Sequence, residues 1–418
     1  MSNIAIFCPP LTGHLNPIAV LGRALLLRGH RVTVFQFEEF RKQVQKEELE
    51  FCALGMQKGS LGDRILEMGQ AQNLRSLRLA IEGARQSAEN ICRHAPAALQ
   101  EYRIDLVLAD QNEPAAGTVA EHLGIPFISL CPSLPLNRES AIPPPFVGWP
   151  YSHSPWGLLR NRIGNRAADF LIAPINRTVN DFRDQWHLRA LRSPDDSFSR
   201  LAQLSQMTRD FDFPRHRLPD TFHYLGPWLE QNPSEDFNFP FARLDGRPMV
   251  YASFGTLQPG AAKQFERIAR ACQLLNLQLV LAAGAATGSM GELPGNPIVV
   301  AYAPQLNLLR KSSVVITHGG MNTVMQALRF GKPILAIPQT HDQPGIAARL
   351  ARVGAGIVLG NKAPTVEAIS AGLQTIISVD DCTDAAKAVQ TSIELAGGVD
   401  TATALIEKVA VLNNTTNY

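Results

Sequence analysis

The stretch VVITHGGMNTVMQALRFGKPILAIPQTHDQ, residues 314–343, contains two apolar runs that are each followed by small and polar residues. The runs VVIT and PILAIP are typical of buried strands in a parallel sheet, and residues 321–330 between them have helical spacing. A strand–helix–strand unit of this kind is the building block of an α/β fold. The polar residues after each run are therefore expected at the carboxyl ends of parallel strands, where open α/β sheets bind ligands.

Further units of the same kind lie on both sides of this stretch. Strand-like runs MVYASFG, LQLVLAAG and PIVVAYAP precede it, and a helix at 343–353, the run GIVLG and a helical stretch at 400–412 follow. The first half of the chain repeats the pattern with NIAIFCP, RVTVFQF, DLVLAD and PFISL. These runs predict an α/β protein with two consecutive Rossmann-like, doubly wound domains.

A polar segment rich in Pro, Asn and Asp separates the two series and is interpreted as an interdomain linker. The predicted organisation is an N-terminal domain at 1–228, a linker at 229–248 and a C-terminal domain at 249–395. A last helix at 396–418 is expected to pack back toward the N-terminal domain.

The composition excludes several classes of protein. The chain has 418 residues, of which 45% are hydrophobic and 18% charged, and its net charge is +2. These values are typical of a globular protein and give no reason to expect a nucleic-acid partner. Six cysteines without CxxC spacing favour reduced thiols in the cytoplasm. The sequence shows no signal peptide and no transmembrane run, so the protein is expected to be soluble or, at most, to lie on a membrane surface.

The segment THGGMNT, 317–323, has the features of an anion site. Backbone N–H groups at a helix start are unpaired and the helix dipole is positive there, and Gly320 allows a phosphate to approach closely. His318, Asn322 and Thr323 add side-chain donors. An ordinary turn with an asparagine cap is the alternative. Ser253 and Thr256 after another strand are expected to present donors to the same diphosphate.

Two more loops carry candidate ligand-binding side chains. Tyr302 stands before a stiffening proline and is suited to stacking on a base, although a packed surface tyrosine explains it equally well. Asp342 and Gln343 stand at a helix entrance, where a carboxylate and an amide suit sugar hydroxyls. A plain N-cap role for Asp342 is the competing interpretation.

His14, in PPLTGHLNP after the first strand, is a candidate general base because histidine titrates near neutral pH. Asp110 ends another parallel strand, and a buried aspartate bonded to the imidazole would fix its tautomer and support its positive form. Asp105, at the other end of that strand, is a poor candidate.

Residues 131–160 are rich in proline and aromatic residues, and the prolines disfavour both helix and central strand. A long ordered loop of this kind is more often a binding lid than a linker. The alternative is that its aromatics pin the loop to the core. The candidate acceptor-binding residues are Phe146, Trp149, Tyr151 and Trp156.

Absent motifs narrow the function further. There is no GxGxxG after the first strand and no GxxxxGK[ST] in the chain, which argues against an NAD dehydrogenase and a P-loop NTPase. The sequence also lacks the clusters of His, Cys or carboxylates that hold metals, so no metal or cofactor is expected.

Taken together, these segments resemble the UDP-dependent glycosyltransferases of the GT-B fold, in which two Rossmann-like domains face each other across a cleft. PPLTGHLNP, LVLADQ, SFGT, APQ, THGGMNT, GKPILAIP and DQ occur in the family's order over nearly the whole chain. The stretches DQNEPAAGTVAEHLGIPFISLCPSLPLNRE and DFDFPRHRLPDTFHYLGP look like the bacterial zeaxanthin glucosyltransferases.

The resemblance implies a role for each matching residue. His14 would deprotonate the acceptor hydroxyl with Asp110 behind it. The residues implied for the donor are Ser253, His318, Asn322 and Thr323 at the diphosphate, Tyr302 and Gln305 at the uracil, and Asp342 and Gln343 at the sugar. Plant members of the family have Trp in place of Tyr302, and Glu gripping the ribose in place of Gln326.

The implied reaction is an inverting, metal-independent transfer of glucose from UDP-glucose to a hydroxyl of a hydrophobic acceptor such as zeaxanthin. A flavonoid or macrolide glycosyltransferase is the alternative within the family. A sugar-nucleotide epimerase or hydrolase would not need the aromatic lid, and a non-catalytic binding protein would not need His14 and Asp110.

Overall fold

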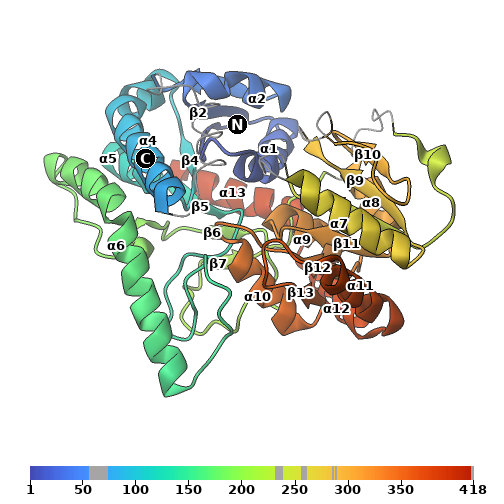
Figure 1. The fold of residues 1–418 in the computed structure, drawn as a ribbon. Helices are drawn as coiled ribbons and strands as arrows, with labels where there is room; N and C mark the ends of the chain where they lie inside the picture. The colour runs from blue at the N-terminus through green and yellow to red at the C-terminus, as the bar shows by residue number, and fades with distance from the viewer. Residues whose placement is uncertain (56–73, 231–238, 256–260, 285–286, 288–289, 416–418) are drawn as a thin grey trace.

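The computed structural model describes residues 1–55, 74–230, 239–255, 261–284, 287 and 290–415. Within these residues the chain forms two parallel β-sheets, each flanked by helices (Figure 1). The prediction of two consecutive α/β series is confirmed. All six cysteines are free thiols.

The first sheet has seven strands in the order β3-β2-β1-β4-β5-β6-β7, and every pair of neighbours is parallel. Its strands are β1 Asn3–Phe7, β2 Arg31–Gln36, β3 Glu50–Ala53, β4 Leu106–Asp110, β5 Phe127–Cys131, β6 Gln203–Ser205 and β7 Phe222–Tyr224. Its helices are α1 Thr12–Leu27, α2 Arg41–Lys46, α4 Leu74–Glu101, α5 Pro114–Leu123 and α6 Pro155–Gln185. Apolar side chains are buried on both faces of the sheet, as a doubly wound fold requires.

The second sheet has six parallel strands in the order β10-β9-β8-β11-β12-β13. Its strands are β8 Met249–Ser253, β9 Gln278–Ala282, β10 Ile298–Val300, β11 Val314–Thr317, β12 Ile334–Ala336 and β13 Gly356–Val358. The helices of this half are α7 Ala261–Leu274, α8 Gln305–Lys311, α9 Met321–Arg329, α10 Gln343–Val353, α11 Val366–Ser378, α12 Asp381–Leu395 and α13 Gly398–Thr415. Short 3₁₀ turns occupy Glu38–Phe40, Pro194–Ser197 and Phe241–Arg243.

The last helix, α13, lies against the N-terminal half (Figure 1). Its residues Ala402 and Ile406 belong to the same apolar core as Leu21 of α1. Glu407 accepts a hydrogen bond from Arg28 at 2.9 Å. The chain therefore crosses from one half to the other twice, and the domain boundaries given above remain predictions. Residues 231–238 of the predicted linker lie outside the described residues.

The structure corrects the sequence interpretation at residues 155–160, which belong to a helix and not to the predicted loop. The Ser154 side chain accepts a hydrogen bond from the backbone N–H of Gly157 at 3.1 Å, and Pro155 occupies the first helical turn, where its missing N–H costs nothing. Proline therefore starts this helix and does not exclude one. The strands β3 (EFCA), β6 (QLS) and β7 (FHY) were also not predicted, because each contains a polar residue and none forms an apolar run, whereas the equally short β10, β12 and β13 are apolar.

A buried charge network joins the two halves. Asp212, in the connection between β6 and β7, accepts hydrogen bonds from Arg349 of α10 at 2.7 Å and from Arg215 at 3.0 Å. The hydroxyl of Tyr224 donates to the same carboxylate at 2.7 Å, and the Arg349 guanidinium lies 4.3 Å from the ring centre of Phe213. Burial alone raises the pKa of Asp212, but the two arginines outweigh it and hold that pKa well below its usual range. Asp212 therefore stays ionised and holds α10 against the N-terminal half.

Replacing Asp212 by Asn should lower the free energy of unfolding by about 3–5 kcal/mol, because two buried guanidinium groups lose their counter-charge. Urea denaturation followed by circular dichroism measures the change. Asp384→Asn is the matched control, since its pair with Lys387 is exposed and should contribute nothing measurable. Equal stability of the two variants would contradict a structural role for the network.

Candidate active site

The predicted pair His14 and Asp110 is in contact in the structure. The parallel register of β1 and β4 places Phe7 opposite Ala109, so the residues after both strands emerge at the same edge of the sheet. His14 Nδ1 lies 2.7 Å from Asp110 Oδ2. The aspartate side chain is fully buried, whereas 18% of the histidine side chain is exposed. The backbone and side-chain N–H groups of Asn112 donate to the other carboxylate oxygen, which fixes its orientation.

His14 lies in the first turn of α1 and not in a loop, which corrects the sequence interpretation. The helix begins at Thr12 and contains Pro17. Proline has no N–H to donate to the carbonyl four residues earlier, which is that of Gly13. That carbonyl instead accepts a hydrogen bond of 2.9 Å from Asn322 Nδ2 of the second half. The proline in α1 therefore creates an acceptor beside His14 that α9 uses.

The charges around His14 favour its protonated form. Burial lowers the pKa of His14, but the charge and hydrogen bond of Asp110 outweigh this effect, so the pKa lies above its ordinary value. Glu113 is also buried nearby, where it accepts a hydrogen bond of 3.1 Å from the Ser87 hydroxyl. Burial raises the pKa of Glu113 to about 8, so at neutral pH this group is mostly uncharged. The sequence reasoning did not single out Glu113, although it lies three residues after Asp110.

His318 is enclosed by the glycines around it. A Cβ atom on Gly320 would lie 2.7 Å from His318 Nε2, and one on Gly255 would lie 3.4 Å from His318 Cε1. Gly319, between His318 and Gly320, has a φ of +86°, a backbone conformation that residues with a side chain disfavour. Burial lowers the pKa of His318, while a hydrogen bond to the Ser253 backbone opposes this shift in part. The imidazole is thus neutral near pH 7 and positioned at the start of α9.

The start of α9 has no side-chain cap, because the N-cap residue is Gly320. The alternative of an asparagine cap is therefore wrong. Asn322 Oδ1 accepts a hydrogen bond from Gln206 Nε2 at 2.9 Å. Both the oxygen and the nitrogen of the Asn322 side-chain amide are therefore hydrogen-bonded to residues of the first half. Thr323 is half-buried in the first turn of the helix. Gln206 was missed because the short strand before it was not predicted.

The strand β8 places Ser253 opposite Thr317 of β11, at the same edge of the second sheet. Ser253 is mostly buried, and its backbone forms a hydrogen bond with the His318 imidazole. Thr256, the other residue predicted in this loop, lies outside the described residues.

The residues predicted to bind the nucleotide are an exposed tyrosine, Tyr302, and two glutamines that are hydrogen-bonded to each other. Tyr302 is 70% exposed, so the alternative of a packed tyrosine is wrong. Gln305 Nε2 donates to Gln326 Oε1 at 2.5 Å, and the Tyr251 hydroxyl donates to Gln305 Oε1 at 3.0 Å. The structure therefore orients the two glutamines relative to each other.

Asp342 and Gln343 stand at the start of α10 as predicted, and their side chains have different partners. Asp342 occupies the N-cap position without capping the helix, and its carboxylate accepts a hydrogen bond from the Ser133 hydroxyl of the first half. Gln343 Oε1 accepts from the backbone N–H groups of Gln339 and Thr340 at 2.9 and 3.0 Å. Gln343 thus shapes the loop after β12. Ser133 was not among the predicted site residues, although it lies just past the carboxyl end of β5, and Asp110 lies at the carboxyl end of the neighbouring strand β4.

The four candidate acceptor residues do not form one cluster. Phe146 is 43% exposed, beside Pro145, whose carbonyl packs against Gly345 of α10. Trp149 lies under the guanidinium of Arg160 at 5.0 Å. Tyr151 stacks on Phe213 with ring centres 5.7 Å apart. These contacts agree with the alternative that the aromatics hold the segment in place.

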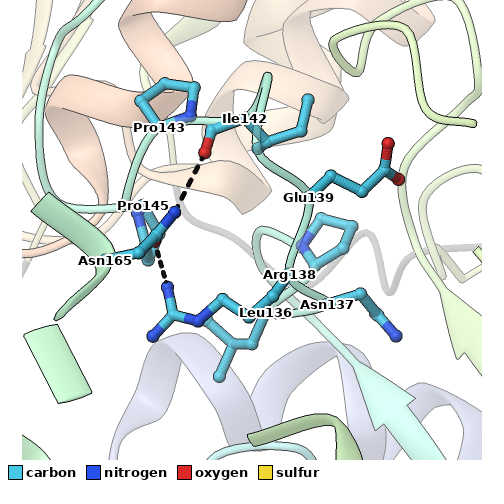
Figure 2. Close-up of a pocket in the computed structure, with 9 residues that line it drawn as sticks. Leu136, Asn137, Arg138, Glu139, Ile142, Pro143, Pro145 and Asn165 are labelled. Carbon is cyan, nitrogen blue, oxygen red and sulfur yellow. Dashed lines mark hydrogen bonds between the residues drawn. The ribbon is translucent and has the colours of Figure 1, made fainter. Parts of the chain in front are cut away.

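Trp156 departs most clearly from the predicted acceptor-binding role. Its side chain is 80% exposed, because position 156 lies on the face of α6 turned away from the protein. A pocket does exist in this region, between residues 135–145 and α6 (Figure 2), and it contains none of the four aromatic residues. Asn165 of α6 lines it and donates to the carbonyl of Ile142 at 3.3 Å.

In the part of the chain that the structure describes, none of the helices combines the length and the apolar content of a membrane-spanning segment. Nor do the described ranges contain three or more His, Cys, Asp or Glu residues grouped to hold a metal ion.

Comparisons with known proteins agree with this architecture. Residues 13–386 match the family model of UDP-glucoronosyl and UDP-glucosyl transferase. The chain is 32% identical over 415 residues to a zeaxanthin glucosyltransferase of Pantoea ananas. The aligned region covers 98% of this chain and 96% of that protein. It is 35% identical over 360 residues to a zeaxanthin glucosyltransferase of Pseudescherichia vulneris, covering 85% and 86% of the two chains.

Solved structures show the same fold. The glycosyltransferase of kitacinnamycin superposes with a TM-score of 0.76 at 22% identity, covering 98% of this chain and 99% of that one. The calicheamicin glycosyltransferase CalG4 gives 0.75 at 18% identity, covering 98% of each chain. The predicted GT-B architecture is confirmed. The chain belongs to the UDP-glucoronosyl and UDP-glucosyl transferase family and is a glycosyltransferase.

Proposed function

We propose that the protein transfers glucose from UDP-glucose to a hydroxyl group of a hydrophobic small molecule, and that this acceptor is a carotenoid such as zeaxanthin. The observation that carries the proposal is the 2.7 Å contact between His14 and Asp110, at the edge of the first sheet that α9 reaches through Asn322. The two zeaxanthin glucosyltransferases that resemble this chain over most of its length support the carotenoid acceptor.

In this proposal His14 is the general base. Its Nδ1 is held by the buried Asp110, so Nε2 is the ring nitrogen available to the acceptor hydroxyl. Asp110 sets the tautomer and balances the positive charge that the imidazole acquires when it takes the proton. The hydroxyl oxygen then attacks the anomeric carbon in a single displacement, so the configuration at that carbon inverts. No enzyme nucleophile and no metal take part.

The donor lies, in the same proposal, against the second sheet. The unpaired N–H groups at the start of α9 and the His318 imidazole stabilise the diphosphate as negative charge grows on it. Ser253, Asn322 and Thr323 add polar groups there, and Thr256 follows Ser253 by three residues in the sequence. The exposed Tyr302 stacks on the uracil beside Gln305, and Gln326 bonds the ribose. Asp342 and Gln343 face the sugar.

The segment between β5 and α6 forms the acceptor side of the site in this proposal. Phe146 is the strongest candidate among its aromatics, because it is partly exposed beside α10. Trp149 and Tyr151 hold the segment in place through their contacts with Arg160 and Phe213. The free cysteines favour a reducing compartment, so we propose the cytoplasm as the site of the reaction.

Incubation with UDP-glucose and zeaxanthin should yield zeaxanthin whose mass has increased by one or two glucosyl groups. Flavonoid and macrolide acceptors in the same panel, and TDP-glucose as a second donor, identify the substrates by mass spectrometry of the products. Transfer to flavonoids or macrolides with none to zeaxanthin would contradict the carotenoid proposal. Release of free glucose without any glycoside would indicate a hydrolase.

His318→Ala should weaken UDP binding by about 1.5–3 kcal/mol, because a hydrogen bond to the charged diphosphate is lost. Gly320→Ala should also weaken binding, since its Cβ displaces the imidazole. Isothermal titration calorimetry with UDP measures both. Gly83→Ala, where the added methyl group meets no atom within 4 Å, is the matched control. Unchanged UDP affinity in His318→Ala would place the diphosphate elsewhere.

His14→Ala should lower kcat by roughly 10²–10⁴-fold while UDP-glucose still binds, because a positioned base contributes about this much. Asp110→Asn should also be slow, and the double variant should be little worse than His14→Ala because the pair acts as a unit. Steady-state kinetics with calorimetry of donor binding checks these values. Multiplicative losses in the double variant would mean that Asp110 acts independently.

The same pair determines the expected pH profile. A general base works in its neutral form, and the pKa of His14 lies above its ordinary value of 6.5. Activity should therefore rise as the pH increases through that raised pKa. Asp110→Asn removes the charge that raises it and leaves the lowering effect of burial, so the acid limb of kcat/KM should move to lower pH. An unchanged acid limb would assign it to another group.

A further inference from the structure

The N-terminal half of α6 carries an exposed row of large apolar side chains. Trp156 is 80% exposed, Leu159 42%, Ile163 59% and Phe170 80%. At about 100° per residue these positions fall within an arc of roughly 60° on one face of the helix. We call this row the α6 stripe. It is an ordered arrangement and not a set of scattered surface residues, since all four side chains point the same way from one rigid element.

The opposite face of the same helix is engaged with the protein. Gly157, Asn161 and Ala168 are buried. Asn161 Nδ2 donates to the carbonyl of Ser140 at 3.2 Å, and Asn165 points inward to residues 138–142, as Figure 2 shows. These hydrogen bonds fix the rotation of α6 about its axis. The α6 stripe is therefore held facing outward, and the helix lies at the outer side of the molecule (Figure 1).

Basic residues border the stripe. Arg162 and Arg166 are exposed and lie beside it on the helix surface. The nearest acidic group on this half of the helix, Asp169, is bound by Arg138 at 2.7 Å, so its charge is balanced within the protein. The outward surface thus combines Trp, Leu, Ile and Phe with positive charge. This is the pattern of an amphipathic helix that lies in the interface of a bilayer containing anionic lipid.

We propose that the α6 stripe binds the surface of a phospholipid bilayer that contains anionic lipids. Trp156 and Phe170 enter the boundary between headgroups and acyl chains, and Arg162 and Arg166 pair with lipid phosphates. A second copy of the chain is a poorer occupant, because two stripes packed face to face would bring the arginines of both copies together. The proposal does not depend on the donor or on the identity of the acceptor.

Flotation of the full-length protein with lipid vesicles tests this surface. The vesicles contain phosphatidylcholine alone, or phosphatidylcholine mixed with phosphatidylglycerol. The native protein should float with the mixed vesicles and bind the neutral ones more weakly. The double variant Trp156→Ser/Phe170→Ser should lose roughly tenfold or more in binding to mixed vesicles, because it removes the largest inserted side chains. Arg162→Gln/Arg166→Gln should lose about tenfold on mixed vesicles and little on neutral ones.

Matched controls carry the same changes elsewhere on the surface. Leu274→Ser/Leu395→Ser removes two side chains that are 72% and 82% exposed, and Arg200→Gln/Arg217→Gln removes two other exposed arginines. Both controls should float like the native protein, and circular dichroism should show all variants folded. Absence of binding to mixed vesicles, or equal flotation of stripe and control variants, would overturn the proposal. A native dimer that only the Trp156→Ser/Phe170→Ser variant dissociates, without lipid binding, would assign the stripe to a second copy.

Discussion

The buried carboxylate of Asp212 is the interaction on which the relation between the two halves depends. An ionised group can be buried only when partners of opposite charge are close, and the partners here come from both halves of the chain. Arg215 lies in the same connection as Asp212, whereas Arg349 belongs to α10. Nearby, Arg352 donates to the backbone carbonyls of Asp210 and Asp212. Breaking the contact between the halves would leave the Arg349 guanidinium without its carboxylate partner, so the contact favours the observed arrangement.

This contact brings the carboxyl edges of the two parallel sheets together. With α10 held in place, Asp342 reaches Ser133 and the residues at the start of α9 reach the start of α1. The two helix starts fit because each has an unusual backbone feature. Pro17 leaves the Gly13 carbonyl free to accept from Asn322, and the glycines before α9 leave space for the His318 ring. The residues proposed for acid–base chemistry, at the edge of one sheet, and those proposed for diphosphate binding, at the edge of the other, thus lie on elements that are in contact.

The local features of this site could be predicted because they depend on neighbouring residues alone. Apolar runs, helix starts and glycine turns identified most strands of both sheets and located His14, His318 and Asp342 at strand or helix ends. Elements that lack a local signal were missed. The short strands β6 (QLS) and β7 (FHY) contain polar residues and form no apolar run, and α6 begins with a proline, which disfavours helix at other positions. As a result Gln206, which follows β6, did not enter the predicted site.

Local sequence was sufficient to predict the fold class, the two consecutive α/β series, the family and the positions of the polar clusters, because periodicity and turn chemistry act over a few residues. Which distant groups meet depends on how the strands and helices pack. His14 and Asp110 are 96 positions apart, and their contact depends on the pairing of β1 with β4. Packing likewise determines that Asn322 forms hydrogen bonds with the first half, that Trp149 packs beneath Arg160 and that Trp156 faces outward. The side of a helix that is buried is set by the surfaces it packs against, and a single segment of sequence does not contain those surfaces.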